Sequence, residues 1–434
     1  MPPTGPRAPH EAEGRAPAAW APVLDGTDRE RALAAVAELA ADVAELPLEG
    51  TSLAGGSVGR ALLHAHLASD DPAQRTAAIA GLRHATTSLG TPGGPSSLHV
   101  GAAGIGWALA HLGGDLLDDR DRCTSLDRAL LRLLDRQPWP GRFDLVTGLV
   151  GLGVYALERL DVPEGRALLE RVVQRLDETA VREGDDVTWW TPPAWMSEEV
   201  RRRSPSGHVD LGVAHGVPGP IALLGAACAA DVASETARTL LEGAVGWLTR
   251  DAVRDHTIGY WSSEPPDGAE ARTAWCYGAP GVAAALLIAA RGADQPAWEH
   301  AAIGLARRAA ARPLDDTGVV DAGVCHGATG VGLTFARLAQ ATGDAVLQDA
   351  ARWWFAHALT LRAPGAGIAG FRFEDAAGAP APGLLDGATG VALALHAAAT
   401  DHAPTWDRTL LLSAASVSAT APTSTGPARR GGLV

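Results

Sequence analysis

The stretch GAPGVAAALLIAA, residues 278–290, joins a Gly-x-x-Gly element to an apolar run, and it decides the fold because the chain repeats it. The element occurs seven times, each time in front of a similar run. Its glycine pairs are Gly56/Gly59, Gly101/Gly104, Gly148/Gly151, Gly216/Gly219, Gly278/Gly281, Gly327/Gly330 and Gly387/Gly390. The intervals between them are too long for one helix and suit a helix pair with a loop of variable length.

Two kinds of helix alternate along this repeat. The runs after the glycines are apolar nearly all round, which is typical of buried helices. The segments before them, such as 27–46, 71–89 and 163–180, are amphipathic, with charges on one face. We therefore predict an all-α fold, an (α/α)7 toroid in which seven inner helices lie within seven outer helices. The alternative is an open α-solenoid of the same repeats, whose apolar ends would need capping.

Composition limits the function and the location. The 434 residues carry 36 basic and 50 acidic side chains, and a net charge of −14 argues against a nucleic-acid partner. The N-terminus lacks the apolar region of a secretory signal, and no apolar stretch is long enough for stable membrane insertion. We expect a cytoplasmic protein. We also expect the toroid to span 25–417 with an insert near 185–208, between arms 1–24 and 418–434 that are disordered.

Polar residues fall in register when the seven elements are superposed on their first glycine. Two cysteines stand two positions before that glycine in neighbouring repeats, and histidines or an aspartate stand one position before it. A second aspartate and an arginine lie slightly further upstream. These residues are Cys276, Cys325, His215, His326, Asp386, Asp144 and Arg272. If the repeats are equivalent, all seven side chains lie at one end of the barrel.

The registered thiols and imidazole suggest a metal site. Cys276, Cys325 and His326 would supply three ligands and leave a fourth position open, which is typical of a catalytic rather than a structural zinc site. We expect the other two cysteines to be bystanders, Cys228 in the core and Cys123 partly exposed. From the residues alone, His215 is either a general acid or base or a loop histidine that is only hydrogen-bonded.

Three motifs resemble those of the lanthionine synthetase C-like family. They are AHGVPG (214–219), WCYGAPG (275–281) and VCHGATG (324–330), and the resemblance extends over about 50–400. It implies a seven-fold α/α toroid that binds Zn²⁺ through Cys276, Cys325 and His326. It also implies that His215 is the acid/base, accompanied by Asp144 and Arg272, and that Trp275 and Tyr277 shape the substrate pocket.

The resemblance further implies a stand-alone class I lanthipeptide cyclase. Such an enzyme adds cysteine thiols of a dehydrated precursor peptide to dehydroalanine or dehydrobutyrine and forms thioether rings. The chain shows no kinase or lyase region, so a separate dehydratase would prepare the substrate. The segment 189–208 resembles the Trp/Pro-rich segment of the family, and its role stays open.

Two other functions remain as alternatives. A non-biosynthetic member of the family would bind glutathione or a peptide thiol through the same zinc. A toroidal glycosidase would need a pair of catalytic carboxylates, which the registered cysteines and histidines do not supply.

Overall fold

The computed structural model describes residues 20–413 except 70, 92, 119, 253–259, 262–270 and 374–380. Residues 1–19 and 414–434, most of the two expected arms, lie outside the described residues, as does the end of the expected toroid at 417. The expectation of disorder was wrong for 20–24. There, Trp20, Val23 and Leu24 are buried in the core.

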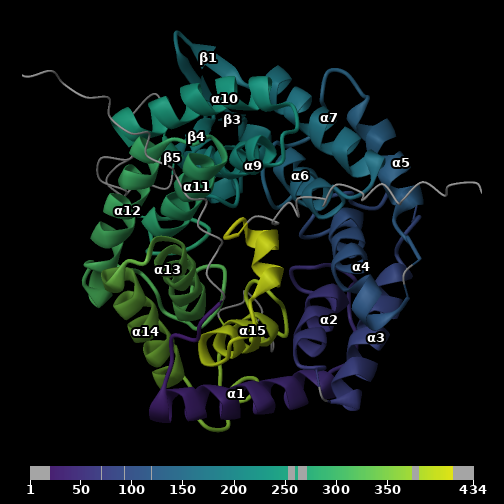
Figure 1. Ribbon diagram of the computed structural model, residues 1–434, viewed down its shortest axis with the longest axis vertical. Helices are drawn as coiled ribbons and strands as arrows, with labels where there is room; N and C mark the ends of the chain where they lie inside the picture. The colour runs from purple at the N-terminus through teal and green to yellow at the C-terminus, as the bar shows by residue number, and fades with distance from the viewer. Residues whose placement is uncertain are drawn as a thin grey trace, which may run out of the picture.

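The described helices form a two-layered ring (Figure 1). The inner helices are α2 (Ser57–His66), α4 (Ala102–Leu116), α6 (Leu149–Glu158), α9 (Pro218–Ala229), α11 (Ala279–Gly292), α13 (Ala328–Thr342) and α15 (Ala388–Ala399). The outer helices are α1 (Gly26–Glu45), α3 (Pro72–Thr86), α5 (Thr124–Leu134), α7 (Pro163–Thr179), α10 (Ser234–Trp247), α12 (Pro296–Ala310) and α14 (Ala345–Thr360). The predicted all-α toroid of seven inner and seven outer helices is confirmed.

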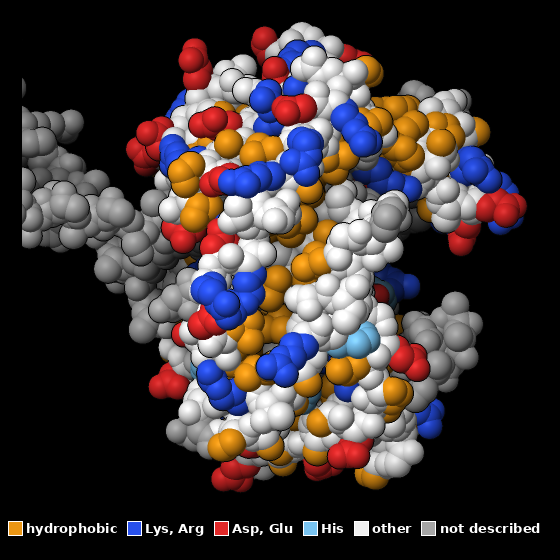
Figure 2. Space-filling model, turned by 90° about the vertical axis from the view of Figure 1, so that its right-hand side faces the viewer, with side chains coloured by type: hydrophobic (Ala, Val, Ile, Leu, Met, Phe, Trp, Pro, Cys, Tyr) orange, Lys and Arg blue, Asp and Glu red, His pale blue; other side chains and the backbone are white. Residues whose placement is uncertain are grey.

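The outer helices are amphipathic, as the sequence predicts. In α5, Leu130 and Leu134 are buried whereas Arg128 and Arg132 are exposed. Figure 2 shows acidic and basic side chains interspersed over the face that forms the right-hand side of Figure 1. None of the described helices is long and apolar enough to cross a membrane.

The two ends of the chain meet and close the ring. Each inner helix contacts the next, and the last of them, α15, contacts the first, α2. The first outer helix, α1, packs on α15. Just before α1, the Trp20 indole nitrogen donates to the Ala397 carbonyl at 2.9 Å, and the Leu24 amide donates to Ala398 at 2.9 Å. The open solenoid is therefore excluded.

The Gly-x-x-Gly elements allow each inner helix to start beneath its own preceding loop. A Cβ atom on Gly104, the second glycine of its element, would lie 2.0 Å from the Leu98 carbonyl oxygen. A Cβ atom on Gly278, a first glycine, would lie 2.1 Å from the Arg272 carbonyl oxygen, and Gly278 has a φ of +138°. Close approach of the backbone therefore excludes a side chain at both positions. At Gly278 the positive φ is a second reason, because only glycine adopts it readily.

We predict opposite effects for two glycine replacements within α4. Gly104→Ala should lower the free energy of unfolding by about 1–3 kcal/mol because its new methyl group overlaps a carbonyl. Gly113→Ala should raise it by up to about 1 kcal/mol, because a Cβ there meets nothing within 4 Å and alanine favours the helix. Urea denaturation measures both values, and equal shifts in the two variants would contradict this account of the glycines.

Backbone hydrogen bonds join the seven loops before the inner helices into a closed circle. Each bond runs from one loop to the next, with nitrogen–oxygen distances of 2.9–3.4 Å. In donor-to-acceptor order they are Ala54 to His99, His99 to Val146, Leu145 to Ala214, Ala214 to Cys276, Cys276 to Cys325, Cys325 to Leu385, and Leu385 to Ala54. Almost all of these residues stand two positions before a first glycine, so the circle fixes that position in every repeat.

The insert between the third and fourth inner helices supplies four of the five strands of two small antiparallel sheets. The first pairs β1 (Val181–Glu183) with β2 (Asp186–Thr188), and the second has the order β3-β4-β5. After β2 the insert continues with β3 (Trp190–Thr191), η1 (Pro193–Trp195), α8 (Glu198–Arg203) and β4 (His208–Asp210). The third strand of the second sheet, β5 (Tyr260–Trp261), comes from the connection between α10 and α11 and pairs with β4. Strand β4 leads directly into the loop that precedes α9.

Residues 401–413 form a segment that lies in the centre of the ring, which we call the central segment (Figure 1). It contains the 3₁₀ helix η4 (Thr405–Leu410). At its start, the Thr405 hydroxyl lies 2.9 Å from His111 Nε2, and near its end the Leu410 carbonyl accepts from the Trp275 indole at 2.8 Å. The central segment therefore runs through the inside of the barrel, an arrangement that the sequence did not predict.

Candidate active site

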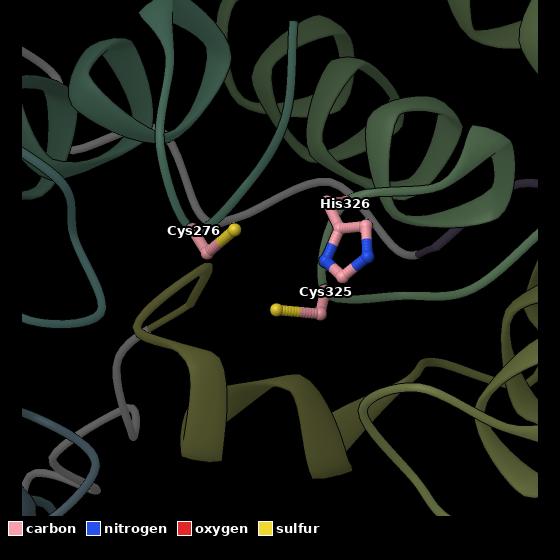
Figure 3. A group of neighbouring side chains, drawn as sticks. All are labelled: Cys276, Cys325 and His326. Carbon is pink, nitrogen blue, oxygen red and sulfur yellow. The ribbon is translucent and has the colours of Figure 1, made fainter. Parts of the chain in front are cut away.

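Three metal-binding side chains meet at the circle of loops. The donor atoms of Cys276, Cys325 and His326 all lie within 4.8 Å of one another (Figure 3). Within the described part of the chain, no other group of three or more Cys, His, Asp or Glu side chains is so close. The two cysteines come from neighbouring loops, and the Cys276 amide donates to the Cys325 carbonyl at 3.2 Å. The circle thus holds the two thiols side by side.

The donor set fits a metal ion such as zinc. Zinc binds thiolates at about 2.3 Å and imidazole at about 2.0–2.1 Å, so small movements of the side chains would bring the three donors to one ion. Cys276 is buried, and Cys325 and His326 are partly exposed. Three protein ligands beside solvent leave a fourth position for another molecule.

The electrostatics of the group favour a thiolate. A hydrogen bond from the Cys325 thiol and a further one from His326 lower the pKa of Cys276. The same hydrogen bond to Cys276, followed by burial, raises the pKa of Cys325 well above its usual value. One proton is thus shared between two thiols, as expected for paired metal-ligand cysteines without a metal charge.

Two carboxylates flank His326. Asp386 Oδ1 lies 3.7 Å from its Nδ1, and Asp321 Oδ2 lies 3.8 Å from its Nε2. Asp321 is held by the Gly323 amide, which donates to its Oδ1 at 2.7 Å. Sequence analysis aligned Asp386 with the other polar residues before the first glycines but assigned it no function, and it missed Asp321. The signal for Asp321 was its position six residues before Gly327, which Arg272 and Asp210 share in their own repeats.

His215 and Asp144 form a pair on adjacent loops. The His215 Nδ1 atom lies 3.4 Å from Asp144 Oδ2. Asp144 is buried and accepts from the Thr147 amide at 2.6 Å, which fixes the carboxylate. Burial lowers the pKa of His215, but the Asp144 hydrogen bond and nearby negative groups outweigh it, so the pKa of His215 is raised. Residues predicted to share one end of the barrel are here in contact.

A further aspartate connects the insert to this end of the barrel. Asp210, the last residue of β4, accepts from the Tyr277 hydroxyl at 2.8 Å and from the Gly212 amide at 2.8 Å. The ring centroids of Tyr277 and His215 are 6.3 Å apart. Sequence reasoning missed Asp210, although it occupies the same repeat position as Asp321.

Trp275 and Arg272 lie in different surroundings. Trp275 is fully buried, and its indole donates to the Leu410 carbonyl of the central segment. Arg272 is exposed and makes no hydrogen bond or ion pair with the other described side chains, although its Cγ lies near Gly318. The predicted roles of Trp275 and Tyr277 in the pocket and of Arg272 in catalysis stay predictions.

The remaining cysteines lie outside the metal-binding group, but their burial differs from the expectation. Cys123 is buried, and its thiol donates to the Gly106 carbonyl at 3.4 Å. Cys228, expected in the core, is only partly buried. Burial raises the pKa of Cys123 to about 11 and also raises that of Cys228. Both thiols are therefore protonated at neutral pH and poorly suited to metal binding.

Comparison with known proteins agrees with this architecture. The family model described as lanthionine synthetase C-like protein matches residues 47–411. Among solved structures, nisin cyclase is similar to the chain with a TM-score of 0.69 and 19% sequence identity, over 88% of this chain and 97% of that one. At that identity the likeness shows the fold alone. No curated protein matches the chain.

Proposed function

Because this chain belongs to the lanthionine synthetase C-like family, we propose that it is a zinc-dependent lanthipeptide cyclase. It would add cysteine thiols of a dehydrated precursor peptide to dehydroalanine or dehydrobutyrine and form lanthionine or methyllanthionine rings. The observation that carries the proposal is the convergence of Cys276, Cys325 and His326 within 4.8 Å at the circle of loops. The chain is then an enzyme that forms carbon–sulfur bonds.

The three donors would hold zinc and leave one position for the substrate thiol. When bound, zinc favours the thiolate form of that thiol at neutral pH and so supplies the nucleophile. Asp386 and Asp321 lie on either side of the His326 ring and would keep it oriented. Because the Cys276 amide donates a hydrogen bond to the Cys325 carbonyl, the protein would hold both sulfur ligands in place before the substrate binds.

The proton transfer would fall to His215. Attack on the β-carbon of the dehydro residue produces an enolate, which must gain a proton at the α-carbon. Asp144 lies 3.4 Å from His215 Nδ1 and raises the pKa of that histidine, so a larger fraction is protonated near neutral pH. Exposed Arg272, without an ion pair among the described residues, would be free to stabilise the enolate oxygen.

Its partners would be a dehydrated precursor peptide, leader and core together, and a separate class I dehydratase that prepares it. We place the reaction in the cytoplasm, where the registered cysteines stay reduced. The toroid domain would begin at residue 20 rather than 25, because Trp20, Val23 and Leu24 are part of its core, and would end at 417.

A reconstitution tests the function. The purified protein is analysed for metal and then incubated with the precursor peptide of the neighbouring gene after dehydration by its dehydratase. We expect about one zinc per chain and the loss of free peptide thiols without a change in mass, measured by thiol alkylation and mass spectrometry. Binding of glutathione with no loss of peptide thiols would instead favour the non-biosynthetic member of the family.

A further inference from the structure

A group of histidines lies at the end of the barrel opposite to the candidate active site. His66 is the last residue of α2, His396 lies in the last turn of α15, and His402 follows shortly after α15. We call these three residues the histidine cluster. The ring centroids of His66 and His402 are 5.3 Å apart, and those of His396 and His402 are 5.7 Å apart. By contrast, the cysteine ligands lie just before the first turns of inner helices.

His66 has the tautomer of a metal-binding histidine. Its Nδ1 atom lies 3.0 Å from the Leu62 carbonyl oxygen, which can only accept a hydrogen bond. Nδ1 must therefore carry the proton, and Nε2 carries a lone pair. Nε2 is buried and has no hydrogen-bond partner among the described residues. Histidines that bind metals commonly donate their second nitrogen to a backbone carbonyl in this way, which orients the free lone pair.

The rings of His396 and His402 also have nitrogens that are available to bind a metal ion. The ring nitrogens of His396 and His402 make no hydrogen bond with any described residue, and their contacts are with neighbouring rings. Burial, followed by nearby His402, lowers the pKa of His396 to about 4, and burial lowers that of His66 to about 3. At neutral pH both rings are uncharged, the form that binds metals.

Another histidine nearby shows the contrast. His111 uses both nitrogens, because Nδ1 lies 2.8 Å from Glu158 Oε1 and Nε2 lies 2.9 Å from the Thr405 hydroxyl. Both ring nitrogens of His111 are therefore paired with polar partners, which is the common arrangement for buried polar groups. In the histidine cluster, by contrast, Nε2 of His66 and the ring nitrogens of His396 and His402 have no such partner among the described residues.

We propose that His66, His396 and His402 form a second metal site, for a divalent ion of intermediate softness such as Zn²⁺, Co²⁺, Ni²⁺ or Cu²⁺. Imidazole suits these ions, and three histidines with an open position are an established ligand set for zinc. The donor atoms lie further apart than those of the cysteine site. Exposed His402 lies between α15 and η4, and its ring is the one that adjoins both of the others.

Occupation of this site would act on the central segment. His402 lies three residues before Thr405, where η4 begins, whereas His66 and His396 belong to two inner helices that contact each other. A metal ion shared by all three would tie the entrance of the central segment to α2 and α15. Because the ion binds the folded chain only, it would raise the melting temperature.

A cobalt titration of the protein carrying one equivalent of zinc, which the cysteine site takes up first, tests the proposal. With the thiolate ligands already occupied, added Co²⁺ should bind at about one further equivalent per chain. Its visible absorption should lack sulfur-to-cobalt charge transfer, and the melting temperature should rise. His402→Ala and His396→Ala should each weaken this binding by at least about tenfold, because even residues beyond the ligands change metal affinity by about 10–100-fold.

The controls separate this site from the rest of the protein. His300→Ala removes an exposed histidine of α12 and should leave cobalt binding and the rise in melting temperature unchanged. Both cluster variants keep buried His66, and circular dichroism checks that they are folded. Absence of a further equivalent in the wild type, or equal binding in all three variants, would overturn the proposal. Because the readout is metal binding without substrate, it is independent of cyclase activity.

Discussion

Replacing Cys276 with alanine is expected to abolish ring closure and to remove most of the bound zinc. The variant leaves one thiol and one imidazole, too few donors to hold zinc firmly or to position a substrate thiol. The fold should persist, because the bond of residue 276 to the Cys325 carbonyl is made by its backbone. Metal analysis, loss of peptide thiols and circular dichroism measure the three effects.

Two other cysteines provide matched controls. Cys123→Ala and Cys228→Ala each remove one thiol from outside the metal-binding group and should keep full zinc content and normal ring closure. Cys123→Ala should lower the free energy of unfolding by roughly 1 kcal/mol, because its thiol is buried and hydrogen-bonded. Full zinc occupancy in Cys276→Ala would remove this residue from the ligand set, and zinc loss in either control would add a ligand to it.

The metal-binding group was predictable because it depends only on the repeat. The cysteines stand at equivalent positions before Gly278 and Gly327, and equivalent positions of neighbouring repeats are neighbours in a ring. The backbone circle gives the physical reason, since it bonds these positions to each other around the barrel. The same logic brought Asp144 and His215 to one end, where the structure has them 3.4 Å apart.

The rest depends on contacts that no repeat encodes. The central segment has no counterpart in the other repeats, and its position rests on unique contacts such as that of Trp275 with Leu410. The N-terminal arm, residues 1–24, is rich in proline and alanine, and we therefore expected it to be disordered. Its last residues, 20–24, are ordered because Trp20 contacts α15. Cys123 is likewise buried, although the charged residues before it suggested that its loop would be exposed.

The second large effect is expected at His215. His215→Asn should slow ring closure by about 10²–10⁴-fold, the usual contribution of a positioned general acid, while zinc content and precursor binding stay normal. The reason is that the metal donors are complete without His215, whereas the enolate would lack its proton donor. Rates of thiol loss and zinc content are measured together. Loss of zinc would make His215 a ligand or its support, and normal rates at every pH would leave it no catalytic role.

Asp144→Asn should change the pH dependence in a defined direction. The hydrogen bond and charge of Asp144 raise the pKa of His215, so their removal lowers it. Because the protonated form is the acid, cyclisation falls as pH rises through this pKa, and the fall should move to lower pH in the variant. The pH profile of the rate measures the shift. An unchanged profile would mean that another group supplies the proton.

Closure of the ring sets an order for synthesis on the ribosome. Helix α1 leaves the ribosome first, yet it packs on α15, which is among the last helices to emerge. Until about residue 400 is free, the nascent chain is an open arc whose two ends expose apolar surface to chaperones and to other chains. Cys276 and Cys325 need only neighbouring repeats, so they can meet before this final step. The contacts of α1 with α15 have the greatest sequence separation and should form late, which makes closure the slow step of folding.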